Sequence, residues 1–142
     1  MHGKSRVCGL ARCVEKDIAA HEALKAAGER ERIHLVVATS PIHRKYKLGK
    51  SREQIRNMAV KSVAMASDLC GEVQFSAEDA SRTEPEFLAE IVESVIDAGA
   101  AVINIPDTVG FTMPEEYFRL ISYLKSHVPN VDRIRLFTRT AC

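Results

Sequence analysis

Short apolar runs rich in β-branched residues alternate with longer amphipathic stretches along nearly the whole chain. The strand-like runs begin near residues 6, 32, 72, 101 and 133, so the average step is about 30 residues, the size of one βα unit. Alternation with short connections produces right-handed crossovers and a parallel sheet. No glycine-rich phosphate loop of either common type follows any of these runs, which disfavours a nucleotide-binding doubly wound fold.

The length of the chain limits which parallel α/β fold it can form. An intact (β/α)8 barrel needs about 250 residues, whereas this chain has 142. With 46% hydrophobic residues, the chain can form one domain or a large part of one. The sequence therefore predicts an α/β fold that is a partial (β/α)8 TIM barrel, with parallel strands, about four βα units and the start of a fifth.

Helix signals lie between the predicted strands, at residues 14–27, 51–70, 86–98 and 112–127. Ser51 with Gln54 predicts a capping box, and Thr112 with Glu115 predicts another. Thr83 is the predicted N-cap of the third helix, and the glycine that follows this helix should end it. These caps predict where each helix begins and ends.

Two predicted strands end in clusters of small, acidic and hydroxyl residues. Residues 72–81 read EVQFSAEDAS, with the strand expected at 73–75. Residues 102–108 read VINIPDT, with the strand expected at 101–105. Because chemistry in parallel α/β proteins is built at the carboxyl ends of the strands, these two junctions predict an active-site face.

The charge and composition exclude several classes of partner. The net charge of +1 and the pI of about 7.7 give no electrostatic case for nucleic acid or an anionic membrane. No apolar run reaches the ~20 residues of a membrane span, and the N-terminal residues lack the apolar region of a signal peptide. We therefore expect a cytoplasmic protein, or a plastid or mitochondrial one in a eukaryote. The absence of a CxxC pair predicts free thiols rather than disulfides or a zinc site at Cys8, Cys13, Cys70 and Cys142.

Four motifs, in the same order and at the same spacing, resemble the 2-isopropylmalate synthase family. They are VCGLARCVEKDI at 7–18, RIH…ATSPIH at 32–43, FSAEDASRT at 75–83 and INIPDTVG at 103–110. The likeness extends from about residue 6 to about residue 136. It implies that residues 1–142 are a fragment of the catalytic barrel, from its second strand to the start of its sixth, without the regulatory domain. Homocitrate, citramalate and methylthioalkylmalate synthases and a metal-dependent carbon–carbon lyase remain alternatives.

The resemblance implies an acyltransferase that performs a Claisen condensation in leucine biosynthesis. A 2-oxoacid, 2-oxoisovalerate for the leucine enzyme, is held on a divalent metal ion (Mg, Mn or Zn). The acetyl group of acetyl-CoA loses a proton and attacks the ketone, and the thioester is then hydrolysed. These small molecules are the expected partners, and the full-length protein is expected to be a homodimer.

The same resemblance assigns six site residues. The expected catalytic residues are Glu78 and His34, and the expected substrate-binding residues are Ser76, Thr108, Pro106 and Leu10. From the residue types alone, purely structural roles stay open: a core histidine, a carboxylate placed for a helix dipole, a turn hydroxyl and a strand terminator. The basic residues 43–47 are expected to form a solvated loop, with coenzyme A phosphates or a neighbouring subunit as the alternative contact.

The family's metal ligands fall outside the matching motifs. The resemblance places an aspartate on an earlier strand and two histidines, in a Val-His-Xaa-His run, after the strand at 134–136. Here residues 137–142 read FTRTAC instead. We therefore expect this chain alone to be inactive, and a truncated non-catalytic chain is the alternative function.

A shift of one base would restore the histidine motif after residue 136. If the Leu136 codon ends in G and TTC, ACN, CGC and ACN follow, reading one base earlier gives GTT, CAC, NCG and CAC, which encode Val-His-Xaa-His. We predict that genomic sequencing from codon 130 onward will reveal this motif in an open frame that continues past codon 142. An in-frame stop directly after FTRTAC would contradict the hypothesis.

Overall fold

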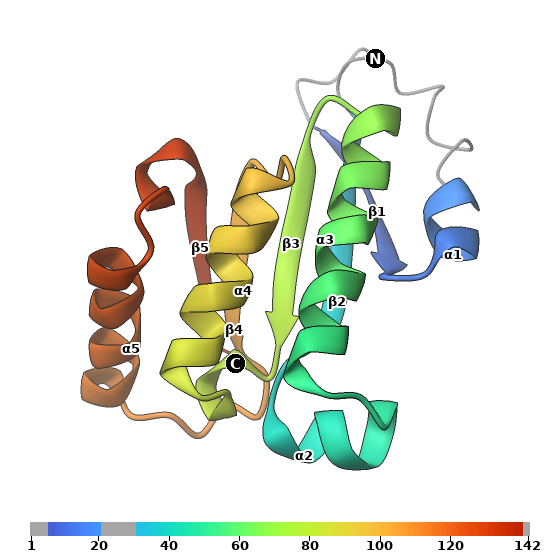
Figure 1. Ribbon diagram of the computed structural model, residues 1–142. Coiled ribbons are helices and arrows are strands. Elements are labelled where there is room, and N and C mark those ends of the chain that lie inside the picture. The colour runs from blue at the N-terminus through green and yellow to red at the C-terminus, as the bar shows by residue number, and fades with distance from the viewer. Residues whose placement is uncertain (1–5, 21–30, 141–142) are drawn as a thin grey trace.

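The computed structural model describes residues 6–20 and 31–140 (Figure 1). In this part of the chain, five strands form one sheet in the order β1-β2-β3-β4-β5, and all neighbours pair in parallel. Each strand therefore pairs with the strand nearest to it in sequence, as in the wall of a barrel. The strands are β1 (Val7–Arg12), β2 (Glu31–Ala38), β3 (Val73–Glu78), β4 (Val102–Asp107) and β5 (Arg135–Thr140).

The helices form one layer beside this sheet. α1 contacts α3, α3 contacts α4, and α4 contacts α5, so the helices follow the order of the strands. Figure 1 shows α3 and α4 lying side by side over the sheet. The second half of the helix predicted at 14–27 lies outside the described residues. The helices are α1 (Glu15–Ala19), α2 (Pro41–His43), α3 (Arg52–Leu69), α4 (Pro85–Asp97) and α5 (Pro114–His127).

The predicted partial (β/α)8 barrel is confirmed by this arrangement, and its two sheet faces differ. Along β2, the fully buried Ile33 and Leu35 face the helices and alternate with the partly exposed Arg32 and His34. Fully burying a side chain of this size stabilises a fold by about 1.5–3 kcal/mol, so the helix side holds the sheet in place. The opposite face, which is the inside of a barrel, carries polar side chains such as Arg32 and His34 and has no helix over it. We call it the open face.

The predicted start of α3 is confirmed in detail. The Gln54 N–H donates to the Ser51 hydroxyl oxygen at 3.2 Å, and the Ser51 N–H donates to the Gln54 side-chain oxygen at 2.9 Å. This reciprocal capping box satisfies two backbone donors that a helix start leaves unpaired. Ile55, Ala59 and Val63 then form the buried stripe that the helical spacing predicts.

The predicted N-cap of α4 is wrong. The N-cap is Glu84, one residue after Thr83, and Pro85 occupies the first turn of the helix. Thr83 is instead part of a buried tertiary contact: its hydroxyl donates to the Asp79 carbonyl at 2.9 Å and lies 2.7 Å from the Thr39 hydroxyl. Because Thr39 is distant in sequence, no local pattern could reveal that contact.

The predicted capping box of α5 is displaced by one residue. The Thr112 N–H donates to the Asp107 carboxylate at 3.0 Å, which ties Thr112 to the end of β4. Glu116, not Glu115, reaches back to accept from the Met113 N–H at 3.0 Å. The helix therefore begins after Met113.

Two strands run further than predicted, and one begins later. β3 and β4 continue past the predicted ends at 75 and 105 to Glu78 and Asp107, because their backbones stay paired with neighbouring strands. The strand predicted from 133 begins at Arg135, after a 3-10 turn at Val131–Arg133. The extensions place polar side chains inside the sheet rather than in loops.

Gly99→Ala is predicted to destabilise the fold by about 1–3 kcal/mol. Gly99 ends α4 with φ 113°, and a Cβ there would lie 2.5 Å from the Ser67 Oγ and 3.2 Å from the Ser67 Cβ. Urea denaturation measures the loss. Gly71→Ala is the control, because a Cβ at Gly71 meets nothing within 4 Å. Equal midpoints for the two variants would contradict the prediction.

Candidate active site

Three polar side chains meet on the open face of the sheet. His34, Ser76 and Asn104 lie on the adjacent strands β2, β3 and β4. The His34 Nε2 is 2.6 Å from the Ser76 Oγ, and the Asn104 Nδ2 donates to the same oxygen at 2.9 Å. The structure therefore brings two of the six predicted site residues, His34 and Ser76, into direct contact.

The environment of His34 keeps its ring neutral. Burial lowers the pKa of His34, and the positive charge of Arg32 lowers it further. Since an unperturbed histidine has a pKa of about 6.5, His34 is uncharged at neutral pH. A neutral imidazole has one N–H donor and one nitrogen acceptor, so it can bind a ligand oxygen or exchange a proton.

Leu10 and Pro106 lie on the same face as His34. Leu10 is in register with His34 across the parallel pair β1–β2 and is 69% exposed, so its side chain can form one wall of a pocket. Pro106 is two residues beyond Asn104 on β4, and residues two apart on a strand share a face. Because β4 continues through Pro106 to Asp107, Pro106 does not terminate the strand.

Glu78 is the last residue of β3 and lies at the carboxyl end of the sheet. The Lys47 Nζ donates to both of its carboxylate oxygens, at 2.8 and 2.9 Å. Glu78 also shares the open face with Ser76, because the two residues are two positions apart on one strand. The ion pair fixes the Glu78 carboxylate at the rim of this face.

The basic segment that holds Lys47 is helical rather than the predicted loop, and only part of it is solvated. Residues 41–48 form α2 and a π-helical turn (Arg44–Leu48), and Arg44 is only 9% exposed. The Arg44 guanidinium donates to the Thr39 carbonyl at 2.6 Å and to both Glu84 carboxylate oxygens at 2.8 Å. Lys45 is among the residues of this segment that are exposed at the surface.

Glu84 is predicted to make the fold sensitive to acid. Hydrogen bonds from Arg44 lower the pKa of Glu84 from 4.5 to about 2. The carboxylate therefore stabilises the folded state above about pH 4.5, by about 1–3 kcal/mol, and this contribution is lost as the pH falls through about 2. In urea unfolding between about pH 6 and pH 2, the stability difference between the wild-type chain and Glu84→Gln should shrink. A difference that stays constant would contradict the prediction.

Thr108 connects the ends of β3 and β4. Its hydroxyl oxygen accepts from the Asp79 N–H at 2.9 Å, and Asp79 has a left-handed backbone with φ 64°. The buried Asp79 carboxylate accepts from the Arg82 Nε at 2.8 Å and lies 3.2 Å from the His43 Nδ1. Burial raises the pKa of Asp79, but hydrogen bonds from Arg82 and Ser40 outweigh it and hold the pKa below its ordinary value. The Thr108 hydroxyl keeps its own proton to donate.

Three polar residues near the predicted site are not among the six that the resemblance assigns. Gln74 and Asn104 lie on the open face, and alternation along β3 and β4 is the signal that could have found them. The third, Asp107, is 1% exposed. It accepts from the Ser81 hydroxyl at 2.8 Å and from the Thr112 N–H at 3.0 Å, so it organises the connection after β4.

The sequence matches a known protein family over most of its length. The match to the family described as HMGL-like covers residues 1–138. The chain belongs to the HMGL-like family.

Two similar relatives of this HMGL-like chain share one name. It is 57% identical over 130 residues to "2-isopropylmalate synthase" of Methylacidiphilum infernorum (isolate V4), covering 91% of the chain and 26% of the relative. The protein of the same name from Bacillus pumilus (strain SAFR-032) is 57% identical over 131 residues, covering 92% and 25%. The HMGL-like chain therefore spans about a quarter of the length of these relatives. The resemblance to 2-isopropylmalate synthase is confirmed.

Solved structures support the HMGL-like fold. The structure of hydroxymethylglutaryl-CoA lyase from Pseudomonas aeruginosa matches with a TM-score of 0.73 at 18% identity, over 94% of this chain and 44% of that one. The structure of HMG-CoA lyase from Brucella melitensis matches with a TM-score of 0.70 at 14% identity, over 95% and 56%. At these identities the likeness concerns the fold alone.

Residues 6–20 and 31–140 contain no group of three or more histidine, cysteine, aspartate or glutamate side chains that could hold a metal ion. Cys8, Cys13 and Cys70 are free thiols, as predicted, and Cys142 lies outside the described residues. No helix in those ranges is both long and apolar enough to cross a membrane.

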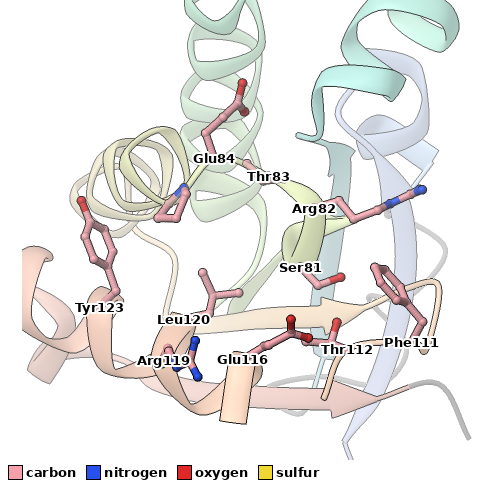
Figure 2. Close-up of a pocket in the computed structure, with 11 residues that line it drawn as sticks. Ser81, Arg82, Thr83, Glu84, Phe111, Thr112, Glu116, Arg119, Leu120 and Tyr123 are labelled. Atoms are coloured by element: carbon pink, nitrogen blue, oxygen red, sulfur yellow. The ribbon is translucent and has the colours of Figure 1, made fainter. Parts of the chain in front are cut away.

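A cavity of about 520 Å³ lies between the start of α4 and α5, away from the open face (Figure 2). Figure 2 shows Glu116, Arg119, Leu120 and Tyr123 of α5 on one side of it, with the segment that precedes α4 on the other. The six site residues predicted from the motifs do not line this cavity. It is therefore separate from the polar network on β2, β3 and β4.

Proposed function

We propose that the chain is part of the catalytic barrel of a 2-isopropylmalate synthase, which condenses acetyl-CoA with 2-oxoisovalerate in leucine biosynthesis. The observation that carries the proposal is 57% identity to proteins of that name over more than nine-tenths of the chain. The contact between His34 and Ser76 on the open face supports it, because both residues belong to the matching motifs. Residues 1–142 form one segment of that barrel in this proposal.

Each proposed site residue has a task that its position permits. Leu10 and Pro106 form apolar walls on the open face. Thr108 presents a hydroxyl that can bind the oxoacid carboxylate, and Ser76, hydrogen-bonded to His34, lines the oxoacid site beside it. His34 and Glu78 are the proposed catalytic residues, and Glu78, at the end of β3, would exchange a proton with the acetyl group.

The complete protein requires more than this chain contributes. A divalent metal ion would polarise the oxoacid ketone, and in this proposal its ligands lie outside this chain. The described residues contain no group of three or more histidine, cysteine, aspartate or glutamate side chains that could hold it. Acetyl-CoA is the proposed co-substrate. We propose a cytoplasmic homodimer for the complete protein, and no activity for this chain by itself.

A chimeric enzyme tests the proposed function. The 130-residue stretch matched in the Methylacidiphilum infernorum relative is exchanged for the corresponding stretch of this chain. We expect the purified chimera to release coenzyme A from acetyl-CoA in the presence of 2-oxoisovalerate and divalent metal. The 142-residue chain assayed in parallel should release none.

Two outcomes of this experiment would contradict the proposal. A folded chimera that cleaves a hydroxyacyl-CoA, and does not condense acetyl-CoA, would favour a carbon–carbon lyase. A folded chimera that prefers 2-oxoglutarate or pyruvate would favour a homocitrate or citramalate synthase. Circular dichroism of the chimera, compared with the unaltered relative, separates these outcomes from misfolding.

A further inference from the structure

The Nε2 atom of His34 lies between two hydrogen-bonding side chains of β3. The Gln74 Nε2 is 3.3 Å from it, and the Ser76 Oγ is 2.6 Å from it. Gln74 and Ser76 are two residues apart on β3, so both reach the open face beside His34. What these two groups donate or accept decides which ring nitrogen of His34 carries the proton.

The orientation of the Gln74 amide is fixed by Arg32. The Arg32 Nη1 donates to the Gln74 Oε1 at 3.1 Å. An arginine side chain has only donors, so the amide oxygen must face Arg32 and the amide NH₂ must face His34. Arg32 is itself held by an ion pair with Glu72, and both side chains are largely buried. Gln74 therefore presents a donor to the His34 Nε2.

Ser76 can present a second donor to the same atom. The Asn104 Nδ2 donates to the Ser76 Oγ at 2.9 Å, which uses an acceptor site of that hydroxyl and leaves its proton free. The short contact from the Ser76 Oγ to the His34 Nε2 is then satisfied when Ser76 donates. A proton on Nε2 would face the Gln74 NH₂ group, so two donors would oppose each other.

The other ring nitrogen of His34 remains available to a ligand. Within residues 6–20 and 31–140, no hydrogen bond to the His34 Nδ1 is formed, and this atom is not among the buried polar atoms that lack a partner. It therefore reaches solvent. A proton on Nδ1 would be a free donor, next to Leu10 in the register of the sheet.

We propose that Gln74, oriented by Arg32, is a positioning residue that holds His34 as the neutral tautomer with its proton on Nδ1. His34 then donates through Nδ1 to an acceptor oxygen of a ligand on the open face. The identity of the ligand rests on the proposed function: the acceptor oxygen belongs to the 2-oxoacid. His34 thus acts as a hydrogen-bond donor, and its Nε2 does not take part in proton transfer.

Nitrogen NMR of the 142-residue chain tests the tautomer directly. The chain is labelled with ¹⁵N-histidine, and the His34 signals are assigned by their loss in His34→Gln. At neutral pH we expect a protonated-type signal for Nδ1 and an unprotonated-type signal for Nε2. A protonated Nε2 in the wild-type chain would overturn the proposal, whatever the variants do.

Substitutions of Gln74 test its part in this arrangement. Gln74→Glu places an acceptor beside the His34 Nε2, so the proton should move to Nε2 or the ring should become charged. Gln74→Met removes the donor without adding charge, and the Nε2–H form should become detectable. Gln54→Glu is the matched control, because glutamate also completes the capping box of α3 and this site lies outside the network. An unchanged His34 tautomer in both Gln74 variants would overturn the proposal.

Titration of the ¹⁵N-histidine-labelled chimeric synthase with 2-oxoisovalerate, in the presence of divalent metal, tests the part that rests on the proposed function. The Nδ1 signal should move as the oxoacid is added, and the His127 signals should not. If the expected tautomer is found but the Nδ1 signal does not move, the donation to a 2-oxoacid is wrong while the tautomer stands. If the signal moves but the proton lies on Nε2, the proposal fails and the proposed function does not.

Discussion

Glu78→Gln should lower kcat of the chimeric synthase by about 100-fold or more, the usual loss when a general acid–base group is removed. Glutamine has nearly the same shape as glutamate, but it cannot take up a proton. Glu78 lies at the carboxyl end of β3, where its carboxylate is held by Lys47 at 2.8 and 2.9 Å. The measurement is the rate of coenzyme A release at saturating acetyl-CoA and 2-oxoisovalerate.

The matched control for this experiment is Glu90→Gln. Glu90 lies on α4 and forms an exposed ion pair with Arg56, remote from the open face. The same chemical change at this position should leave kcat unaltered. If Glu78→Gln keeps more than about a tenth of the wild-type kcat while its melting temperature is unchanged, Glu78 is not a proton-transfer residue.

Arg44→Met should destabilise the 142-residue chain by about 3 kcal/mol. The substitution leaves the Thr39 carbonyl without its 2.6 Å donor and removes both 2.8 Å hydrogen bonds to the Glu84 carboxylate. Arg52 still contacts Glu84 at 2.7 Å, but its side chain is half exposed and cannot replace the buried Arg44 guanidinium. Urea unfolding monitored by circular dichroism gives the free energy of unfolding.

Arg56→Met is the control for the Arg44 prediction. Arg56 and Glu90 form an ion pair whose side chains are 35% and 49% exposed. Exposed pairs of this kind contribute less than about 1 kcal/mol, so the loss should be small. Similar losses in the two arginine variants would show that burial of Arg44 does not matter to the stability of the fold.

The fold was predictable because its signals are local and repeated. Each βα unit carries its own apolar run and its own amphipathic helix, and alternation alone determines a parallel sheet. The ends of β3 and β4 were not predictable in the same way. Ser76 and Glu78 resemble loop residues by type, but backbone pairing with β2 keeps them in the sheet. Strand length was decided by the neighbouring strand and not by the residues themselves.

The family motifs predicted the candidate site only in part. His34 and Ser76 lie in two motifs, and the structure places them 2.6 Å apart. Gln74 and Asn104 act through contacts with side chains on other strands, which composition does not reveal. Arg44 was misjudged for the same reason, because its partner Glu84 is 40 residues away in sequence. Burial of a charged residue depends on a partner that one segment cannot identify.

The order of strands in the sheet also bears on how the chain is synthesised. Every strand from β2 to β5 pairs with the strand just before it, so its first partner has already left the ribosome when it emerges. Translation adds roughly 10 residues per second, and a βα unit of about 30 residues therefore appears about every 3 s. Closing a short loop and forming a helix take microseconds or less. The described part of the barrel wall can therefore be built during translation, one unit at a time.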